Sequence, residues 1–203
     1  MTSLLNFLTT MPKGKDLNKL LKPLPKCPLQ SYLGKGVHTL GLLDWILKQT
    51  GRADVFVSTF STSDAFLRGF YNLRKKGLVA HSVLMADLKA SKKTLKLYRE
   101  MQCCFDSVYL TMNHSKVVLV QNESHLVTVI SSQNQTYGDR AECTIITTDQ
   151  EVFLQQYSGF KDLVEDKSIH LNGLFNGLAG KGQGSGGKAD SGYGDWRPFG
   201  YPD

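Results

Sequence analysis

The chain lacks long hydrophobic runs, and it also lacks any cysteine spacing that would indicate a metal or redox site. It has four cysteines in 203 residues; Cys103 and Cys104 are adjacent, Cys27 and Cys143 stand alone, and no Cys-x-x-Cys occurs. This usage is typical of unpaired thiols in a reducing compartment. The first fifteen residues lack the basic region of a signal peptide and the length of a membrane span. We therefore predict a cytoplasmic protein that does not enter the membrane.

Acidic residues are the minority charge. Lysine and arginine number 24 against 18 aspartates and glutamates, which gives a net charge of +6. Such a balance favours anionic partners, with nucleic acid (DNA or RNA) preferred over a lipid surface because no amphipathic membrane helix is evident. The candidate nucleic-acid-binding residues lie on two neighbouring predicted helices and the segment between them: Arg74, Lys75, Lys89, Lys92, Lys93 and Lys96. A solvated helix face explains these cations equally well.

Composition divides the chain into three parts. Residues 1–36 are rich in lysine and proline and are predicted to form an arm that packs over the domain or a partner subunit. Residues 37–172 are predicted to form one folded domain. Residues 173–203 contain ten glycines and are predicted to be a flexible tail. The aromatic residues of that tail, which suit a docking partner or base stacking, are Tyr193, Trp196, Phe199 and Tyr201.

Hydrophobic periodicity predicts alternating helices and strands in the domain. Helices are expected over residues 37–50, 63–76 and 91–104, with a last one beginning at 151–157. Strands are expected over 55–60, 78–86, 107–111, 116–120, 126–130 and 143–147. Alternation at the start favours parallel pairing with helices covering the sheet, and a hairpin later in the chain makes the sheet mixed. The predicted fold class is therefore α/β, a mixed β-sheet flanked by helices.

The predicted hairpin carries the polar residues of greatest interest. If its turn centres on Glu123, His114 lies opposite Ser132 and Lys116 lies opposite Ile130. Side chains alternate faces with period two, so His114 and Lys116 share a face, as do Ser132 and Asn134. Together they suit a phosphate, because lysine neutralises charge, serine and asparagine bind oxygens, and histidine attacks or transfers a proton.

At these residues the chain resembles the phospholipase D superfamily. The signature of that family is His-x-Lys, four residues, Asp, a short apolar strand, Gly-Ser-x-Asn and a downstream Glu. The matching residues are His114, Lys116, Ser132, Asn134 and Glu142. Gln121 stands at the Asp position, Ser131 stands at the Gly position, and the turn is longer than usual. The resemblance extends over residues 40–157 and implies a phospholipase D-like fold.

The resemblance also implies a mechanism with two histidines and with no metal or cofactor. One histidine forms a phospho-histidine, the other protonates the leaving oxygen, and water then attacks the intermediate. The chain has a single His-x-Lys, so the site would need a homodimer with His114 from both subunits at the two-fold axis. Lys116 and Asn134 would hold phosphoryl oxygens and Ser132 would add a hydrogen bond. Glu142 would orient His114 through its second ring nitrogen.

Several other polar residues are not assigned a catalytic role. Asn113 and Ser131 border the expected site. The other histidines have no comparable neighbours in the sequence and are interpreted as structural or exposed: His38, His81, His125 and His170.

Three hypotheses follow from the sequence. The first is a dimeric, metal-independent phosphodiesterase, foremost a nuclease. The second is a non-catalytic relative that binds DNA or RNA, with Gln121 in place of Asp as its sign. The third is an assembly module that docks through its tail. Retention of all five matching residues favours the first hypothesis, and a monomer in solution would count against it.

Overall fold

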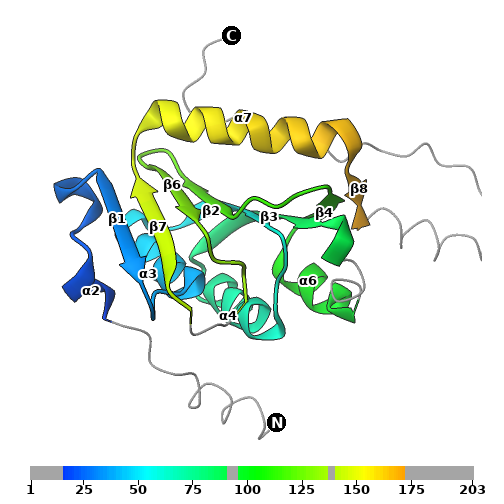
Figure 1. Cartoon of the computed structure of the whole chain (residues 1–203), viewed down its shortest axis with the longest axis horizontal. Helices are drawn as coiled ribbons and strands as arrows, with labels where there is room; N and C mark the ends of the chain where they lie inside the picture. The colour runs from blue at the N-terminus through cyan, green and yellow to red at the C-terminus, as the bar shows by residue number, and fades with distance from the viewer. Residues whose placement is uncertain (1–15, 91–95, 137–139, 172–203) are drawn as a thin grey trace, which may run out of the picture.

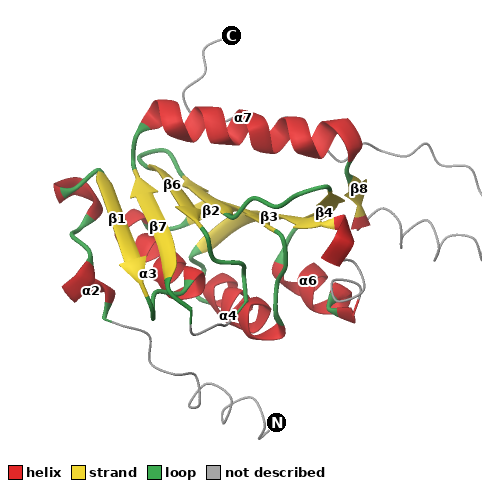
Figure 2. Ribbon diagram, viewed as in Figure 1, coloured by secondary structure: helices red, strands yellow, loops and turns green. Residues whose placement is uncertain are grey.

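The structure is a computed structural model that describes residues 16–90, 96–136 and 140–171. These residues form one mixed α/β domain around an eight-stranded sheet of order β1-β7-β6-β5-β2-β3-β4-β8 (Figures 1 and 2). The strands are β1 (Leu29–Gly34), β2 (Ala53–Thr59), β3 (Val79–Asp87), β4 (Ser107–Thr111), β5 (Val117–Gln121), β6 (Leu126–Ser131), β7 (Glu142–Thr147) and β8 (Ile169–His170). The helices are α2 (Leu17–Leu20), α3 (Thr39–Thr50), α4 (Asp64–Lys75), α6 (Tyr98–Cys104) and α7 (Gln150–Lys167), with short 3-10 turns at Leu24–Lys26 and Leu88–Ala90.

The pairing confirms the predicted mixed sheet. β2 pairs with β3 and β3 pairs with β4 in parallel, as the alternating start of the domain indicated. The hairpin of β5 and β6 and the pairings of β1 with β7, β6 with β7, β2 with β5 and β4 with β8 are antiparallel. The carboxyl ends of β2, β3, β4 and β6 therefore lie at the same edge of the sheet, where β5 and β7 begin.

Helices cover the sheet on both faces. α3, α4 and α6 lie against one face, and α7 runs across the other (Figure 1). Every second residue of a strand enters the same core, so Val118 packs with the first group of helices and Leu119 packs beneath α7. α7 contributes its apolar stripe at helical spacing to the second core: Phe153, Tyr157, Phe160 and Val164.

Local signals place the helix ends close to the predicted positions. The Ser63 hydroxyl caps α4 by accepting a hydrogen bond from the Phe66 amide at 3.3 Å. α3 stops at Gly51, whose φ of +79° suits glycine and whose amide bonds to the Leu47 carbonyl at 2.9 Å. α7 is longer than the stretch predicted to begin it, because its apolar stripe continues to Val164.

The structure corrects the prediction for the start of the chain. Residues 29–34, predicted to belong to an arm, form strand β1 and pair with β7 along their whole length. The prolines before β1 bar a helix but not an edge strand. The buried Gln30 side chain folds this proline-rich stretch back, since it bonds both the amide and the carbonyl of Lys22 at 2.7 Å.

Some predictions fall outside the described residues. Residues 1–15 of the predicted arm, the first part of the predicted helix over 91–104 and the tail from residue 172 onward are among them. The candidate cations Lys92 and Lys93 lie there too, as do the tail aromatics and their expected docking role.

The register of the hairpin differs from the prediction by one residue. Val117, not Lys116, lies opposite Ile130, and the Ser131 amide bonds to the Lys116 carbonyl at 2.9 Å. The turn causes this shift in register. The side-chain oxygen of Asn122 accepts hydrogen bonds from the amides of Ser124 and His125 at 3.0 and 2.9 Å. A four-residue loop centred between Glu123 and Ser124 results. Lys116 therefore lies opposite Ser131.

Candidate active site at the carboxyl edge of the sheet

All five residues of the predicted site lie at the carboxyl edge of the parallel strands. Ligands of open α/β sheets commonly bind at this edge. His114 and Lys116 precede β5, Ser132 and Asn134 follow β6, and Glu142 opens β7. The helices α3 and α4 begin at the same edge, so their positive dipole ends face it.

His114 and Lys116 contact one another directly. The Lys116 Nζ lies 2.6 Å from the His114 carbonyl oxygen and 3.3 Å from its Nδ1. The ring of Phe60 lies against the imidazole with centroids 5.0 Å apart. Burial lowers the pKa of Lys116, and the nearby charge of Glu142 partly opposes that shift. The site therefore holds an exposed imidazole beside an anchored cation.

Ser132 and Glu142 form a second pair. The Ser132 hydroxyl donates a short hydrogen bond to Glu142 Oε2 and accepts one from the Cys143 amide at 3.0 Å. The Ser132 amide in turn donates to the Cys143 carbonyl at 3.0 Å. Glu142 therefore orients Ser132, and the predicted contact between Glu142 and His114 is wrong for this structure. The reason is that Ser132 turns toward β7 as it leaves β6.

The loop that carries Asn134 is anchored on both sides. Before it, Gln133 is 6% exposed and its Oε1 accepts from the amide and the hydroxyl of Thr39 at 3.1 and 3.3 Å. After it, the Gln135 amide bonds to the Ser61 carbonyl at 3.1 Å. These anchors fix the backbone around Asn134. Its own Oδ1 is buried and has no hydrogen-bond partner among the described residues.

Asn113 holds the backbone that leads into His114. It is 4% exposed, and its Nδ2 donates to the Ser58 hydroxyl at 2.9 Å. Its Oδ1 accepts from the amide and hydroxyl of Ser115 at 2.9 and 2.7 Å, and its own amide bonds to Asp87 at 2.8 Å. The sequence placed Asn113 at the border of the site, but its contacts with β2 and β3 require the tertiary structure. Phe60 was not predicted from the sequence to belong to the site, and only the tertiary structure places its ring against His114.

The four candidate nucleic-acid-binding cations that the structure describes are not gathered in one place. Arg74 lies near the end of α4, away from the site edge, and bonds to Asp106 at 2.8 Å and to the Cys104 carbonyl at 2.9 Å. Its guanidinium thus ties α4 to the segment before β4. Lys75 is exposed and lies over the Tyr71 ring at 5.7 Å from its centroid. Lys89 and Lys96 are exposed, and Lys89 lies two residues after the end of β3 at the site edge.

Two features are absent from the part of the chain that the structure describes. No group of three or more histidine, cysteine, aspartate or glutamate side chains in this part of the chain is arranged to hold a metal ion. None of its helices combines the length and the hydropathy that crossing a bilayer requires.

Comparison with known proteins finds likeness in structure alone. No protein-family model matches the chain, and no curated protein matches it in sequence. Polyphosphate kinase from Porphyromonas gingivalis is similar in structure, with a TM-score of 0.51 and 14% identity over 80% of this chain and 29% of that chain. Phosphatidylserine synthase from Haemophilus influenzae matches with a TM-score of 0.48 and 13% identity over 70% and 39%. TrmBL2, an archaeal chromatin protein, matches with a TM-score of 0.43 and 10% identity over 76% and 59%.

The chain thus spans between 29 and 59% of the length of these three structures. At such low identity the likeness concerns the fold. The comparison therefore shows that this mixed α/β domain shares its fold with part of the polyphosphate kinase chain, which is consistent with the phospholipase D-like fold predicted from the sequence.

Proposed function

We propose that the protein is a metal-independent phosphodiesterase, foremost a nuclease, that acts through a phospho-histidine on His114. One observation carries the proposal. The Lys116 ammonium contacts His114 at the carboxyl edge of the sheet, and the Ser132–Glu142 pair faces the same edge. An imidazole, a cation and an oriented hydroxyl around one exposed position are the groups that phosphoryl transfer requires.

The proposed reaction has two displacements. His114 of one subunit attacks phosphorus, so that a P–N bond forms and the P–O bond to the leaving alcohol breaks, while the partner's His114 gives its proton to that oxygen. The partner's His114 then accepts a proton from water, whose oxygen attacks phosphorus and breaks the P–N bond. Lys116 neutralises the phosphoryl oxygens, and the Ser132 hydroxyl would donate to one of them after releasing Glu142.

The contact with Lys116 indicates the resting tautomer of His114. An ammonium group only donates hydrogen bonds, so His114 Nδ1 is the acceptor in its contact with Lys116. The neutral ring then carries its proton on Nε2. The nucleophilic role requires that proton on Nδ1 instead, and the acid role requires the imidazolium, which is protonated on both nitrogens. A phosphate that draws Lys116 toward its own oxygens would release Nδ1 for a proton in either role.

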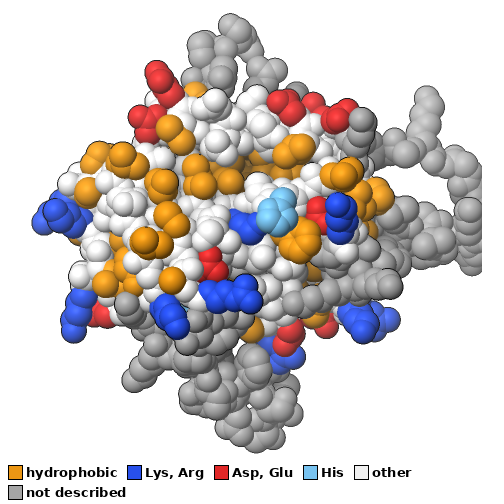
Figure 3. Space-filling view, viewed as in Figure 1, with side chains coloured by type: hydrophobic (Ala, Val, Ile, Leu, Met, Phe, Trp, Pro, Cys, Tyr) orange, Lys and Arg blue, Asp and Glu red, His pale blue; other side chains and the backbone are white. Residues whose placement is uncertain are grey.

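A homodimer would supply the second histidine, and an uncovered apolar surface favours it. This surface, the β1–β7 face, continues the face of the sheet beneath α7 but extends beyond that helix. Ile145 of β7 pairs with Ile130 of β6 on one side and with Ser31 of β1 on the other. Ser31 lies between the two exposed leucines of β1, which point to the same face of the sheet. The exposed apolar side chains there are Leu29 (66%), Leu33 (78%), Ile130 (36%) and Ile145 (37%). Figure 3 shows hydrophobic side chains gathered over β1 and β7.

A second copy of the chain is the occupant that we propose for the β1–β7 face. Two copies with a net charge of +6 each repel one another unless their contact is largely uncharged. The four apolar residues of this face meet that condition. The face also borders the site, because Gly34 at the end of β1 pairs with Glu142, and exposed Met112 lies two residues before His114.

Nucleic acid is the substrate that the charge favours. The chain is basic overall, and exposed Lys89 follows β3 at the site edge. Binding of nucleic acid to a basic protein weakens steeply as salt is added, because each phosphate that the protein neutralises releases counterions. The free thiols of the described cysteines accord with the proposed cytoplasmic location.

The test is cleavage of labelled single- and double-stranded DNA and RNA in excess EDTA by the parent and by His114→Ala. We expect the parent to cleave at least one polymer and the variant to lose at least 1000-fold in rate, as removal of a covalent nucleophile does. His125→Ala is the matched control, because this imidazole lies in the β5–β6 turn at the opposite edge. Binding without cleavage would favour a non-catalytic module, and cleavage by His114→Ala would refute the mechanism.

A further inference from the structure

An aromatic side chain lies beside the proposed nucleophile. The Phe60 ring contacts the His114 imidazole, with centroids 5.0 Å apart and planes inclined by 56°. Phe60 directly follows β2 at the carboxyl edge of the sheet, and its side chain is partly exposed. The other six phenylalanines among the described residues are buried. Phe60 is therefore the phenylalanine of this part of the chain that a ligand at His114 can contact.

Packing in the core does not account for Phe60. In β2, Phe56 packs in the core beneath α7 and Val57 packs in the core with α3 and α4. Phe60 belongs to neither of these two cores of the described residues, because the strand ends at Thr59 and the chain then turns into α4. A ring outside the core gains less from burial, so the contact with His114 is what distinguishes this position.

A hydrogen bond ties the backbone before Phe60 to the residue before His114. The Thr59 carbonyl accepts from Asn113 Nδ2 at 3.3 Å. Thr59 is 0% exposed and Asn113 is 4% exposed, so water does not compete for this bond. The two rings therefore follow residues that are bonded to each other, and their contact is built into the fold.

The other side of the Phe60 loop is held by Gln135. The Gln135 amide donates to the Ser61 carbonyl at 3.1 Å, and the Ser63 hydroxyl donates to the Gln135 carbonyl at 3.2 Å. Between these bonds Thr62 forms a parallel bridge with Gln135. The loop is thus fixed before a ligand arrives, which lowers the entropy cost of binding to Phe60.

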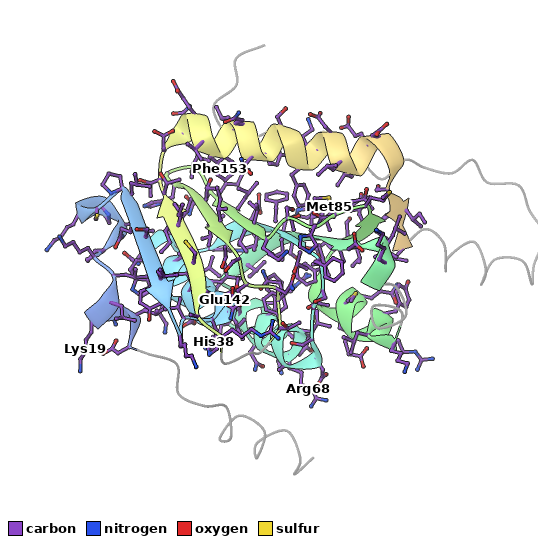
Figure 4. The ribbon with its side chains drawn as sticks, viewed as in Figure 1. Lys19, His38, Arg68, Met85, Glu142 and Phe153 are labelled. Carbon is purple, nitrogen blue, oxygen red and sulfur yellow. The ribbon has the colours of Figure 1, made fainter. Side chains whose placement is uncertain are left out.

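A cation and an aromatic ring flank His114. The Lys116 Nζ lies 3.3 Å from His114 Nδ1, and Glu142, labelled in Figure 4 where β7 begins, acts on Lys116 through its charge. A phosphorus in position for attack lies within about 3.5 Å of the imidazole nitrogen. The sugar and base of that nucleotide are the next groups, so the base can reach Phe60. The site thus suits a ligand that joins an anionic group to a flat ring.

We propose that Phe60 is a stacking platform for the unpaired base next to the phosphate that His114 attacks. Every base has a flat face that stacks on an aromatic side chain, so the contact does not depend on base identity. In a duplex the bases stack on one another and are not available to the ring. The site therefore prefers single-stranded nucleic acid over duplex. The inference rests on the proposed function for the place of the phosphate, and its own content is a binding preference.

The test measures dissociation constants in a His114→Gln background, in which the proposed reaction does not occur and a side chain still lies beside Phe60. The ligands are decathymidylate and a decamer of abasic deoxyribose residues with the same number of phosphates. Phe60→Leu keeps an apolar side chain but removes the aromatic faces. It should weaken binding of decathymidylate about tenfold, the effect of losing one stacked base, and binding of the abasic decamer less than about twofold. Phe60→Trp should bind decathymidylate at least as tightly as the background.

A duplex ligand and a matched variant complete the design. The background protein should bind decathymidylate more tightly than a blunt DNA hairpin with the same number of phosphates, and Phe60→Leu should reduce that preference. Tyr71→Leu makes the same kind of change at an exposed ring in the middle of α4 and should alter none of the constants.

Equal weakening of decathymidylate and the abasic decamer by Phe60→Leu, or weakening of neither, would overturn the inference. Thermal unfolding of each variant shows whether a loss comes from the fold. If Phe60→Leu does not fold, Phe60→Trp decides, because stacking requires that its effect be confined to the ligand that has bases. A background protein that binds no single strand would overturn the inference as well. Failure of the proposed function is distinct: a parent that binds single strands through Phe60 but cleaves no polymer would refute the nuclease and retain the stacking platform.

Discussion

Lys116, directly before β5, and Gln121, the last residue of β5, lie on opposite faces of the sheet. They are five residue steps apart, about 17 Å along an antiparallel strand. Lys116 shares the face of Val118, which packs against α3 and α4, whereas Gln121 shares the face of Leu119 beneath α7. Gln121, which stands at the Asp position of the motif that the sequence resembles, pairs with Asp54 of β2 at the edge opposite the proposed phosphate site.

Gln121→Leu should stabilise the fold. The Gln121 side chain is 0% exposed, and neither its Oε1 nor its Nε2 has a hydrogen-bond partner among the described residues. An unpaired buried polar group costs ~1–3 kcal/mol, so an apolar replacement should raise the free energy of unfolding by about 1 kcal/mol without changing cleavage. Urea unfolding measures this. Thr128→Val is a second test, because the buried Thr128 hydroxyl also has no hydrogen-bond partner among the described residues. If both variants were less stable than the parent, ordered water molecules would be the partners of these groups.

Asn113→Ala should reduce both stability and cleavage. It leaves buried partners on β2 and β3 without their hydrogen bonds, which costs ~1–3 kcal/mol, and frees the backbone next to His114. The comparison is Asn122→Ala, which also removes several hydrogen bonds but lies in the turn at the other edge of the sheet. We expect comparable losses of stability, with a fall in kcat of at least tenfold for Asn113→Ala alone. Equal kcat values for the two variants would contradict the positioning role.

Asp106→Asn should remove stability that depends on pH. Burial alone would raise the pKa of Asp106, but the hydrogen bond and charge of Arg74, together with bonds from Ser82, outweigh it and lower the pKa. A lowered carboxyl pKa stabilises the fold above the unfolded pKa, near ~3.9, and that contribution is lost as the pH falls through the folded value.

Urea unfolding between pH 3 and pH 7 checks this prediction. The free energy of unfolding of the parent should exceed that of Asp106→Asn by about 1 kcal/mol at pH 7, a figure reduced for partial solvent screening, and this difference should begin to shrink as the pH falls below ~3.9 toward pH 3. Asp64→Asn, in an exposed pair with Arg68, should have a smaller effect. A difference that stays constant with pH would rule out the charge as its cause.

The four thiols should react at very different rates. Cys103 and Cys143 are exposed, Cys27 is partly buried, and Cys104 is buried. Burial raises the pKa of Cys104 to about 12, so its reactive thiolate is scarce at neutral pH. Alkylation with iodoacetamide followed by peptide mass spectrometry should find Cys103 and Cys143 modified first and Cys104 last. Early modification of Cys104 would show that α4 and α6 separate readily.

Ile145→Glu should disrupt the proposed homodimer. A carboxylate in the centre of the β1–β7 face would be buried against its own copy across a two-fold contact. Sedimentation equilibrium should show a dimeric parent and a weakening of at least 100-fold in the variant, with cleavage lost in parallel. Leu163→Glu, at an equally exposed apolar position on α7, should remain dimeric. A monomeric parent that still cleaves would overturn the two-fold site.

Local patterns in the sequence were sufficient for most of the elements. Alternating apolar residues, capping side chains such as Ser63 and the stop at Gly51 act within one or two turns, so they are readable without the fold. β1 was missed because prolines precede it and its burial depends on β7, a strand more than one hundred residues later. The hairpin was predicted, but the hydrogen bonds of Asn122 shifted its register by one residue.

The sequence by itself determined which chemical groups this protein has: one His-x-Lys, a Ser-x-Asn, a glutamate and an excess of positive charge. Only the tertiary structure decided which of them meet. Glu142 pairs with Ser132 and not with His114, and His38 meets Gln133 across 95 residues of chain. Residue types and short periods are properties of the chain alone. Contacts between distant residues depend on strand order, because the sheet brings the ends of β1 and β6 and the start of β7 to one edge.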